Sequence, residues 1–264
     1  MQRFVIVLVT LVALVSFAPS TLAQEAGVQT MRQRGWIDVN LGAAGAGQDT
    51  LSTAYNKGDG TGEMEIYRVS YSFPRGASFD FGGGVMFTPL FGAGVAFTGT
   101  AHEDAAGLSI RIPHPLYYDS FASDSKDTEN KLLRTEGGVN LSVVVIPPIR
   151  SNRLVMKLFA GPTYFRLKAD AVSNVRYEQV YGIFTRANAV EISDYDTVEV
   201  EETGWGLHAG ADIGFFFSRY VGVGGFARFS HGTLTVEDSR VPVDDPVDVK
   251  LGGVQAGAGL RIRF

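Results

Sequence analysis

The sequence predicts an all-β fold, a transmembrane antiparallel up-and-down β-barrel of about eight strands, and three observations support it. Segments along the chain alternate apolar with small or polar residues, which is the pattern of strands with one apolar face. Short turns and long connections join these segments in alternation. The hydrophobic content of 45% and the mean hydropathy of +0.07 are moderate, as expected when lipid-facing and lumen-facing residues average out.

Residues 1–23 are expected to be a cleaved secretory signal peptide. Arg3 carries a positive charge, residues 4–18 are mostly apolar, and small residues precede a cleavage point after Ala23. An uncleaved anchor helix is the alternative, but about fifteen apolar residues are short for a span of roughly twenty. The sequence contains no Cys, so disulfides cannot contribute to its stability.

The expected barrel covers residues 35–264, after a short periplasmic segment at residues 24–34. Eight strands are expected in chain order, at residues 36–44, 78–87, 93–100, 133–145, 154–164, 205–217, 221–229 and 251–264. Short turns follow the second, fourth and sixth strands, and Pro147 and Pro148 bar continued ladder pairing in the middle turn. An even number of strands places both termini at the periplasmic end.

The four long connections are expected to be loops at the opposite end, because bacterial membrane barrels have short turns on one side and long loops on the other. These connections are residues 45–77, 102–131, 170–203 and 232–249. Residues 67–73 alternate well, and we interpret them as an extension of the first hairpin beyond the membrane. A ten-stranded barrel with a further hairpin within residues 102–131 is the alternative.

The inward face of the predicted strands is rich in Gly and in charged side chains. This composition favours a membrane barrel over a periplasmic sandwich or lipocalin-like barrel with an apolar interior. Seven residues are expected to form a lumen charge network: Asp80, Glu136, Lys157, Asp212, Arg228, Arg261 and Arg263. With a turn centred near Tyr220, Arg228 and Asp212 fall opposite each other and should form an ion pair. The network is expected to fill a narrow lumen, and a gate or narrow ion path is the functional alternative.

The last strand ends on Phe264, with Leu260 and Ile262 at alternate positions before it. It resembles the closing strand of bacterial outer-membrane barrels, which implies that these three residues form a barrel-assembly signal. Together with the signal peptide, the strand–turn rhythm, and the segments 224–231 and 261–264, it makes the chain resemble one family. That family is the small eight-stranded outer-membrane β-barrels, which include the OmpA transmembrane domain and the OmpW group.

The resemblance implies location in the outer membrane of a Gram-negative bacterium, contact with outer-membrane lipid and lipopolysaccharide, and insertion by the barrel-assembly machinery. A monomer is expected, with no peptidoglycan-binding domain after the barrel. Members of the family act as anchors, adhesins, narrow channels or lipid A-modifying enzymes, so the fold leaves the function open.

No catalytic residue, cofactor or metal site is expected. Ser230 and His231 invite comparison with the lipid A deacylase barrels, but adjacent strand residues point to opposite faces. No nearby carboxylate on that strand would orient the histidine. His102, His114 and His208 are scattered and lack metal-ligand spacing.

The third long connection is the most charged part of the chain. Six carboxylates crowd twelve residues and could bind a hard cation: Glu191, Asp194, Asp196, Glu199, Glu201 and Glu202. Their spacing matches no EF-hand, and Val198 and Val200 alternate with the acidic residues. This alternation favours a solvated acidic hairpin.

We therefore expect a non-enzymatic outer-membrane protein with a structural or surface-interaction role through large acidic extracellular loops. A narrow channel for small or hydrophobic solutes is the first alternative, and a lipid-modifying enzyme is the second. The formal net charge of −5 and the lack of a basic stripe exclude nucleic acid as a partner.

Overall fold

The structure is a computed structural model that describes residues 34–46, 50–58, 62–73, 75–149, 151, 153–236, 240–241 and 247–264. The expected signal peptide and residues 24–33 lie outside the described residues. Twelve strands make up the described fold. Within the same ranges, no helix is long and apolar enough to cross a membrane.

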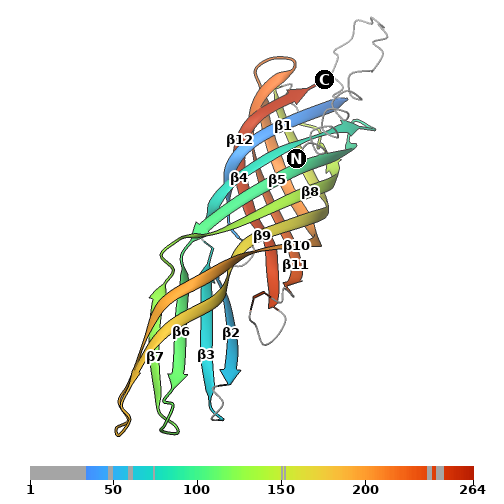
Figure 1. Cartoon of the computed structure of the whole chain (residues 1–264). Helices are drawn as coiled ribbons and strands as arrows, with labels where there is room; N and C mark the ends of the chain where they lie inside the picture. The colour runs from blue at the N-terminus through green and yellow to red at the C-terminus, as the bar shows by residue number, and fades with distance from the viewer. Residues whose placement is uncertain are drawn as a thin grey trace, which may run out of the picture. The chain divides into compact units, whose positions relative to one another are not determined.

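Eight strands close into an antiparallel barrel in the order β1-β12-β11-β10-β9-β8-β5-β4 (Figure 1). These strands are β1 (Gly35–Ala44), β4 (Gly76–Met86), β5 (Phe91–Asp104), β8 (Leu132–Val145), β9 (Leu154–Tyr181), β10 (Asn188–Phe216), β11 (Val221–Val236) and β12 (Val247–Arg263). The ring closes between its first and last strands, where Trp36 lies opposite Arg263 and Ala44 opposite Gln255. The eight-stranded prediction is thus confirmed, and the ten-stranded alternative is wrong.

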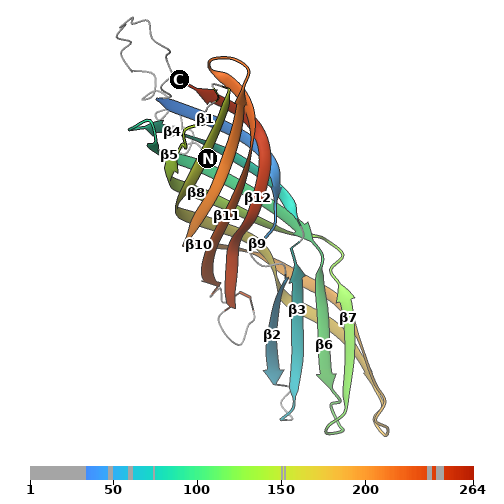
Figure 2. The ribbon, with the colours of Figure 1, turned by 180° about the vertical axis from the view of Figure 1, so that it is seen from behind.

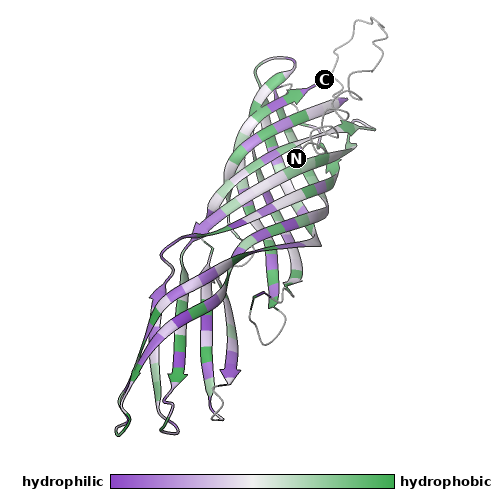
Figure 3. Cartoon of the chain, viewed as in Figure 1, coloured by the Kyte–Doolittle hydropathy of each residue, from purple (hydrophilic) through white to green (hydrophobic). Residues whose placement is uncertain are grey.

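The apolar residues of the barrel strands point outward. Leu41 and Leu207, for example, keep 70% and 68% of their surface exposed. Exposed apolar side chains also occur on other barrel strands, including Phe79 on β4, Leu141 on β8, Val223 on β11 and Val254 on β12. Figure 3 shows the resulting alternation of hydrophobic and hydrophilic residues along the strands. A soluble protein does not leave so continuous an apolar surface in water, so the lipocalin-like alternative is wrong and the barrel is a transmembrane one.

The short turns and the C-terminal residue lie at the same end of the barrel. The carbonyl of Phe264 accepts hydrogen bonds from the backbone N–H groups of Arg34 and Gly35, at 2.7 and 2.9 Å. In two of the turns, a hydroxyl caps the backbone, because Thr88 accepts from Phe91 N–H and Ser218 accepts from Val221 N–H, each at 2.9 Å. These bonds fix the tight turns that the sequence predicts.

Three of the four expected loops are instead built from strands. β2 (Thr50–Gly58), β3 (Met64–Ser72), β6 (Ala106–Pro113) and β7 (Phe121–Asp127) form a separate sheet in the order β2-β3-β6-β7. β9 and β10, 28 and 29 residues long, run on from the barrel as a paired ribbon beside this sheet (Figure 2). We call this sheet, together with residues 170–203 of the ribbon, the extension. The connections at residues 45–77, 102–131 and 170–203 thus lie outside the barrel as predicted, but they pack as strands of one folded unit and not as separate loops.

The extension has a hydrophobic core of its own. Val69, Leu108 and Ile110 from the sheet are 1–3% exposed and belong to one cluster with Val172 and Ile192 from the ribbon. Alternate residues of each layer face the other layer, as in a β-sandwich. The alternation at residues 67–73 is thus correctly interpreted as structure outside the barrel, although its strand also pairs with β6. The core makes the extension a folded platform.

We predict that Leu108→Ala loosens the extension and leaves the barrel intact. Removing a side chain that is 1% exposed leaves a cavity, which typically costs about 2–5 kcal/mol. Hydrogen exchange of the β6 amides should accelerate. The unboiled protein should still migrate faster than the boiled protein in SDS gels, a gel shift that reports a folded barrel. Val180→Ala, at a residue that is 75% exposed, is the matched control and should change neither readout. Loss of the gel shift in Leu108→Ala would contradict the independence of the two parts.

Candidate functional site

The lumen holds a cluster of charged side chains around Arg261 of β12. Its guanidinium contacts both carboxylate oxygens of Asp212, at 2.5 and 3.2 Å, and donates to Asn40 Oδ1 at 2.5 Å. Lys157 forms ion pairs with Asp38 and, at 3.4 Å, with Asp212. Arg261 is only 1% exposed, and its buried positive charge therefore has to be stabilised by these partners.

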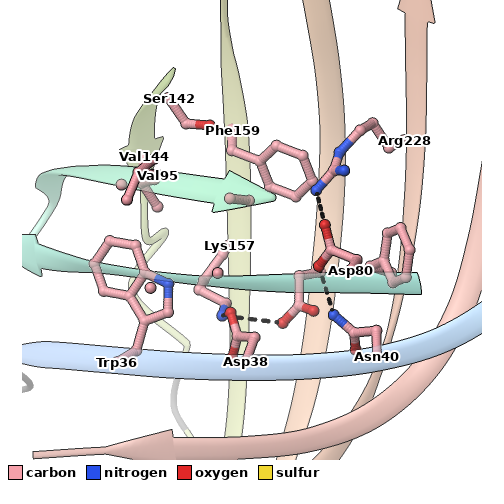
Figure 4. Close-up of a pocket in the computed structure, with 16 residues that line it drawn as sticks. Trp36, Asp38, Asn40, Asp80, Val95, Ser142, Val144, Lys157, Phe159 and Arg228 are labelled. Carbon is pink, nitrogen blue, oxygen red and sulfur yellow. Dashed lines mark hydrogen bonds and ion pairs between the residues drawn. The ribbon is translucent and has the colours of Figure 1, made fainter. Parts of the chain in front are cut away.

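A second buried ion pair lies beside this cluster. Arg228 donates to Asp80 Oδ2 at 2.7 Å, and Asn40 Nδ2 donates to Asp80 Oδ1 at 2.9 Å (Figure 4). The rings of Phe159 and Phe226 each have their centroids 5.4 Å from the Arg228 guanidinium. Asn40 thus connects the two ion-paired groups.

The predicted ion pair between Arg228 and Asp212 is wrong. In the β10–β11 ladder Arg228 lies opposite Gly210, and Asp212 lies opposite Phe226. The turn is centred one residue earlier than expected, at Arg219, which displaces every partner by two residues. The inward direction of both side chains is nonetheless as predicted, since both are buried.

Two of the seven predicted network residues lie away from the cluster. Glu136 pairs with Arg134 at 2.6 Å and accepts from Gly252 N–H at 2.8 Å. Arg263 lies over the Phe216 ring, 3.9 Å from its centroid, and donates to the Arg219 carbonyl. The other five predicted residues, Asp80, Lys157, Asp212, Arg228 and Arg261, come together.

Sequence reasoning missed Asp38 and Asn40, both of which belong to the cluster. The signal was present, since Trp36, Asp38 and Asn40 alternate with Ile37, Val39 and Leu41 along β1. Asp38, Asp80 and Asp212 then balance Lys157, Arg228 and Arg261. The formal charge of these six side chains sums to zero.

The rest of the lumen is filled by rings and neutral polar groups. His208 contacts the hydroxyls of Ser142 and Thr163, each at 2.9 Å, and Thr163 donates to Asn140 at 2.7 Å. Gly210 leaves room for an inward ring, because a Cβ there would lie 2.6 Å from Phe159. The cavity among the charged residues is only about 50 Å³. This packing fits an eight-stranded barrel whose interior holds its own side chains.

The adjacent residues Ser230 and His231 lie on opposite faces of β11. Ser230 is 2% exposed, whereas His231 is exposed and stacks near Phe229, so the two point to opposite faces as predicted. No group of three or more His, Asp or Glu residues among those described could hold a metal ion.

The six acidic residues of the third connection lie along β10 and are not gathered in a loop. Arg176 pairs with Asp194 and Asp196, and its hydrogen bond lowers the pKa of Asp194. Lys168 pairs with Glu199 at 2.9 Å. Glu201 contacts Arg166 at 2.5 Å, while Glu191 lies opposite Glu178, and Glu202 opposite Leu167. Cross-strand cations thus pair with four of the six carboxylates, and the six residues lie on the long β9–β10 hairpin, as the favoured interpretation of an acidic hairpin predicts.

The extension contains a groove that sequence reasoning missed because its strands fall in the expected loops. It has a volume of about 550 Å³ and lies between β2–β3 and the ribbon. Tyr55 stacks on Tyr67 with ring centroids 4.6 Å apart, and Tyr177 lies beside them. Glu65 accepts hydrogen bonds from Tyr67 and Tyr177, at 2.6 and 2.8 Å. Lys57, Asn174, Arg176 and Glu178 give the groove a polar rim.

The far end of the extension, which we call the tip, consists of residues 62–64, 114–120 and 180–187. His114 contacts the Gly182 carbonyl at 3.2 Å, and Asp119 N–H donates to Glu63 at 2.8 Å. Large hydrophobic side chains at the tip remain exposed: Met64, Leu116, Tyr118, Val180, Ile183 and Phe184. Phe184 is 90% exposed. An exposed apolar cluster on a folded support is typical of an interaction surface.

The chain matches no protein family model and no curated protein. Several solved structures resemble it, and three of them show the likeness at low identity. The outer membrane protein OprG from Pseudomonas aeruginosa has a TM-score of 0.46 and 12% identity, and the match covers 88% of this chain and 97% of OprG. The outer membrane protease OmpT from Escherichia coli has a TM-score of 0.45 and 10% identity, and the match covers 90% of this chain and 99% of OmpT. Ail, the attachment invasion locus protein of Yersinia pestis, in complex with a heparin analogue, has a TM-score of 0.37 and 13% identity, and the match covers 86% of this chain and 99% of Ail. The fold itself rests on the closed strand order and the apolar belt, which are those of a small outer-membrane β-barrel.

We predict that Asp80→Ala costs about 3–5 kcal/mol of unfolding free energy, because it leaves the Arg228 guanidinium buried without its carboxylate. Asp80→Ala combined with Arg228→Met removes both charges and should recover most of the loss. Urea unfolding in lipid vesicles, followed by tryptophan fluorescence, measures both. Glu103→Ala, at an exposed residue, is the control. Equal destabilisation by the single and double changes would contradict the pairing.

We predict that the extension loses stability above about pH 10. Burial and the nearby Glu65 carboxylate raise the pKa of Tyr55 to about 12, and the same causes raise the pKa of Tyr67. An unfolded phenol ionises near pH 10, so the stabilisation is complete below that pH and is lost as pH rises toward 12. Tyrosinate absorbance and proteolysis, followed against pH, check this, and Tyr55→Phe should weaken the pH dependence. Ionisation of Tyr55 at pH 10 would count against it.

Proposed function

We propose that the protein is a non-enzymatic, non-conducting outer-membrane barrel that presents the extension at the cell surface for binding. One observation carries the proposal: the extension has its own core and ends in an exposed apolar tip. In outer-membrane barrels the short turns face the periplasm, which directs the extension outward. The role is therefore assigned to a folded platform and not to acidic loops.

The lumen supports this proposal over the alternative of a narrow channel. The three carboxylates of the charge cluster pair with its three buried cations, and aromatic rings lie against the Arg228 guanidinium. A solute would have to displace paired charges that are mostly buried, and separating such pairs costs several kcal/mol for each charge.

The buried polar groups also support a non-enzymatic role. Ser142 contacts His208, but the other ring nitrogen of His208 meets the Thr163 hydroxyl and not a carboxylate. A hydroxyl without an oriented base remains a weak nucleophile. This arrangement is better suited to packing the lumen.

The expected partners fit the same picture. The apolar belt would contact outer-membrane lipid and lipopolysaccharide. The barrel-assembly machinery would contact the end of β12, where three apolar residues are exposed: Leu260, Ile262 and Phe264. The protein would act as a monomer, since the barrel strands have no unpaired edge within the ring.

The test is a barrel without its extension. The register gives the joining points: residues 45–75, 105–131 and 170–199 are each replaced by a short turn, so that Ala44 leads to Gly76, Asp104 to Leu132, and Ala169 to Val200. The shortened chain should keep its gel shift, because the barrel ladders are untouched. Outer-membrane vesicles bearing either chain are applied to arrays of matrix proteins, oligosaccharides and lipids.

The full chain should bind at least one class of array element that the shortened chain does not bind. A milder variant, Ile183→Ser with Phe184→Ser, asks whether the tip makes the contact and should weaken binding at least in part. Equal binding by the full and shortened chains, or no binding by either, would contradict a surface role for the extension.

A further inference from the structure

A further cavity, which we call the base cavity, lies where β2 and β3 of the extension meet the barrel strands. Its volume is about 70 Å³, several times the roughly 10–15 Å³ that one water molecule needs. Most of its wall is apolar, and the residues come from strands of both parts of the molecule: Leu51, Phe73, Leu167, Val200, Val236 and Val249. Cavities with such walls favour an apolar occupant over water.

The base cavity is buried on one side and accessible on the other. Leu167 of β9, Val200 of β10 and Val249 of β12 are buried. Leu51 of β2 and Ala169 of β9 are only half-buried, although both line the same cavity. A small molecule can therefore reach the cavity from its half-buried rim.

Arg134 of β8 supplies a polar group to this apolar wall, and it is 2% exposed. Its Nη2 donates to Glu136 at 2.6 Å and to the Lys250 carbonyl at 2.8 Å, and the Phe73 ring centroid lies 4.4 Å from its guanidinium carbon. The Nε–H of Arg134 has no hydrogen-bond partner among the described residues. A buried donor without a partner is destabilising, and an oxygen atom of a ligand would satisfy it.

The charges around the base cavity favour an uncharged acceptor. Glu136 already neutralises the Arg134 guanidinium, and Asp170 adds a carboxylate to the wall. An anionic ligand would therefore meet a like charge in apolar surroundings, where charges interact more strongly than in water. A carbonyl oxygen only accepts hydrogen bonds, whereas an alcohol would bring an O–H group that needs an acceptor of its own.

We propose that the base cavity binds a small uncharged carbonyl compound, a ketone, ester or lactone with a short aliphatic chain. Its oxygen accepts a hydrogen bond from Arg134 Nε, and its chain packs on the apolar wall. The small volume limits the chain to a few carbon atoms and excludes the acyl chains of membrane lipids. This site adds a small-molecule ligand to the contact proposed for the tip and does not depend on that contact.

The test measures binding of 2-hexanone to the full-length protein in lipid nanodiscs, by NMR of labelled Leu and Val methyl groups. The ketone should shift the methyl signals of Leu51, Leu167 and Val249 in a saturable manner. Signals of Leu41 and Leu207, which are exposed on the barrel exterior, report ketone that merely dissolves in the lipid. Hexanoate and 2-hexanol have similar chains and should bind at least about tenfold more weakly, because one brings a charge and the other an unpaired O–H.

Variants separate filling of the cavity from loss of the donor. Ala169→Phe fills the base cavity and should weaken ketone binding about tenfold or more, and Ala171→Phe on the same wall serves if the first variant does not fold. Ala54→Phe, at an exposed residue of β2, is the matched control and should change binding less than about twofold. Arg134→Met combined with Glu136→Gln removes the donor and both charges, and should reduce the preference for the ketone over the alcohol to less than about twofold.

The gel shift and slow exchange of the β6 amides show that the barrel and the extension are folded in every variant. The proposal is overturned if the ketone shifts only the lipid-facing signals, or if the folded Ala169→Phe or Ala171→Phe variant binds it unchanged. Equal or tighter binding of hexanoate would overturn the uncharged acceptor. An unchanged preference in the Arg134→Met and Glu136→Gln double variant would overturn the role of Arg134. None of these outcomes bears on the shortened-chain experiment, so the two proposals can fail separately.

Discussion

The buried contact between Arg261 and Asp212 joins the closure of the barrel to the filling of its lumen. Arg261 lies on the closing strand, Asp212 lies on β10, and Asn40, which accepts a hydrogen bond from Arg261, lies on the first strand. A guanidinium that is 1% exposed requires its partners, because an unpaired buried charge is costly. The β1–β12 register that brings Asn40 to Arg261 therefore also determines which side chains meet in the lumen.

The same constraint supports the proposal that the function does not reside in the lumen. Because Lys157, Arg228 and Arg261 are each paired with a carboxylate, the charge cluster has no net formal charge, and the cavity within it is small. The part of the molecule that remains available is the extension, which the β9–β10 ribbon supports directly. That ladder continues from Leu154 and Phe215 in the barrel to Tyr181 and Asn188 at the tip, with register shifts only near Ile192 and Asp196. The barrel thus supports a platform through continuous hydrogen bonding.

The sequence was informative wherever one face of a strand meets lipid. Leu207 and Phe229 alternate with glycines and charged residues, and this contrast predicts both the strand and its outward face. It was less informative in the extension, where neither layer meets lipid. Val198 and Val200 alternate with glutamates, and residues 67–73 alternate with polar residues, yet short-range patterns do not reveal that β3 and β10 share one core. Pairing between distant strands depends on long-range contacts that alternation does not encode.

The lumen shows a similar division between what can and cannot be predicted. Alternation correctly directs Asp80, Lys157, Asp212, Arg228 and Arg261 inward, because direction depends only on a period of two. Their partners depend on the residue at the centre of each turn. The third turn is centred at Arg219 and not at Tyr220, so Phe226 lies opposite Asp212 where Arg228 was expected. Asp38 and Asn40 were within reach of the same pattern, since they share a face with Trp36. Which carboxylate meets which cation could not be predicted without the barrel's tilt and closure.

The central claim, that paired charges close the lumen, is tested most directly by conductance in a planar lipid bilayer. The account predicts no discrete current steps for the full-length protein, even where the gel shift shows folded barrels. A variant with Asp80→Ala, Arg228→Ala and Phe159→Ala removes one ion pair and one ring, and should show steps that confirm insertion. Regular steps from the unmodified protein, of the same size as those of this variant, would contradict the account.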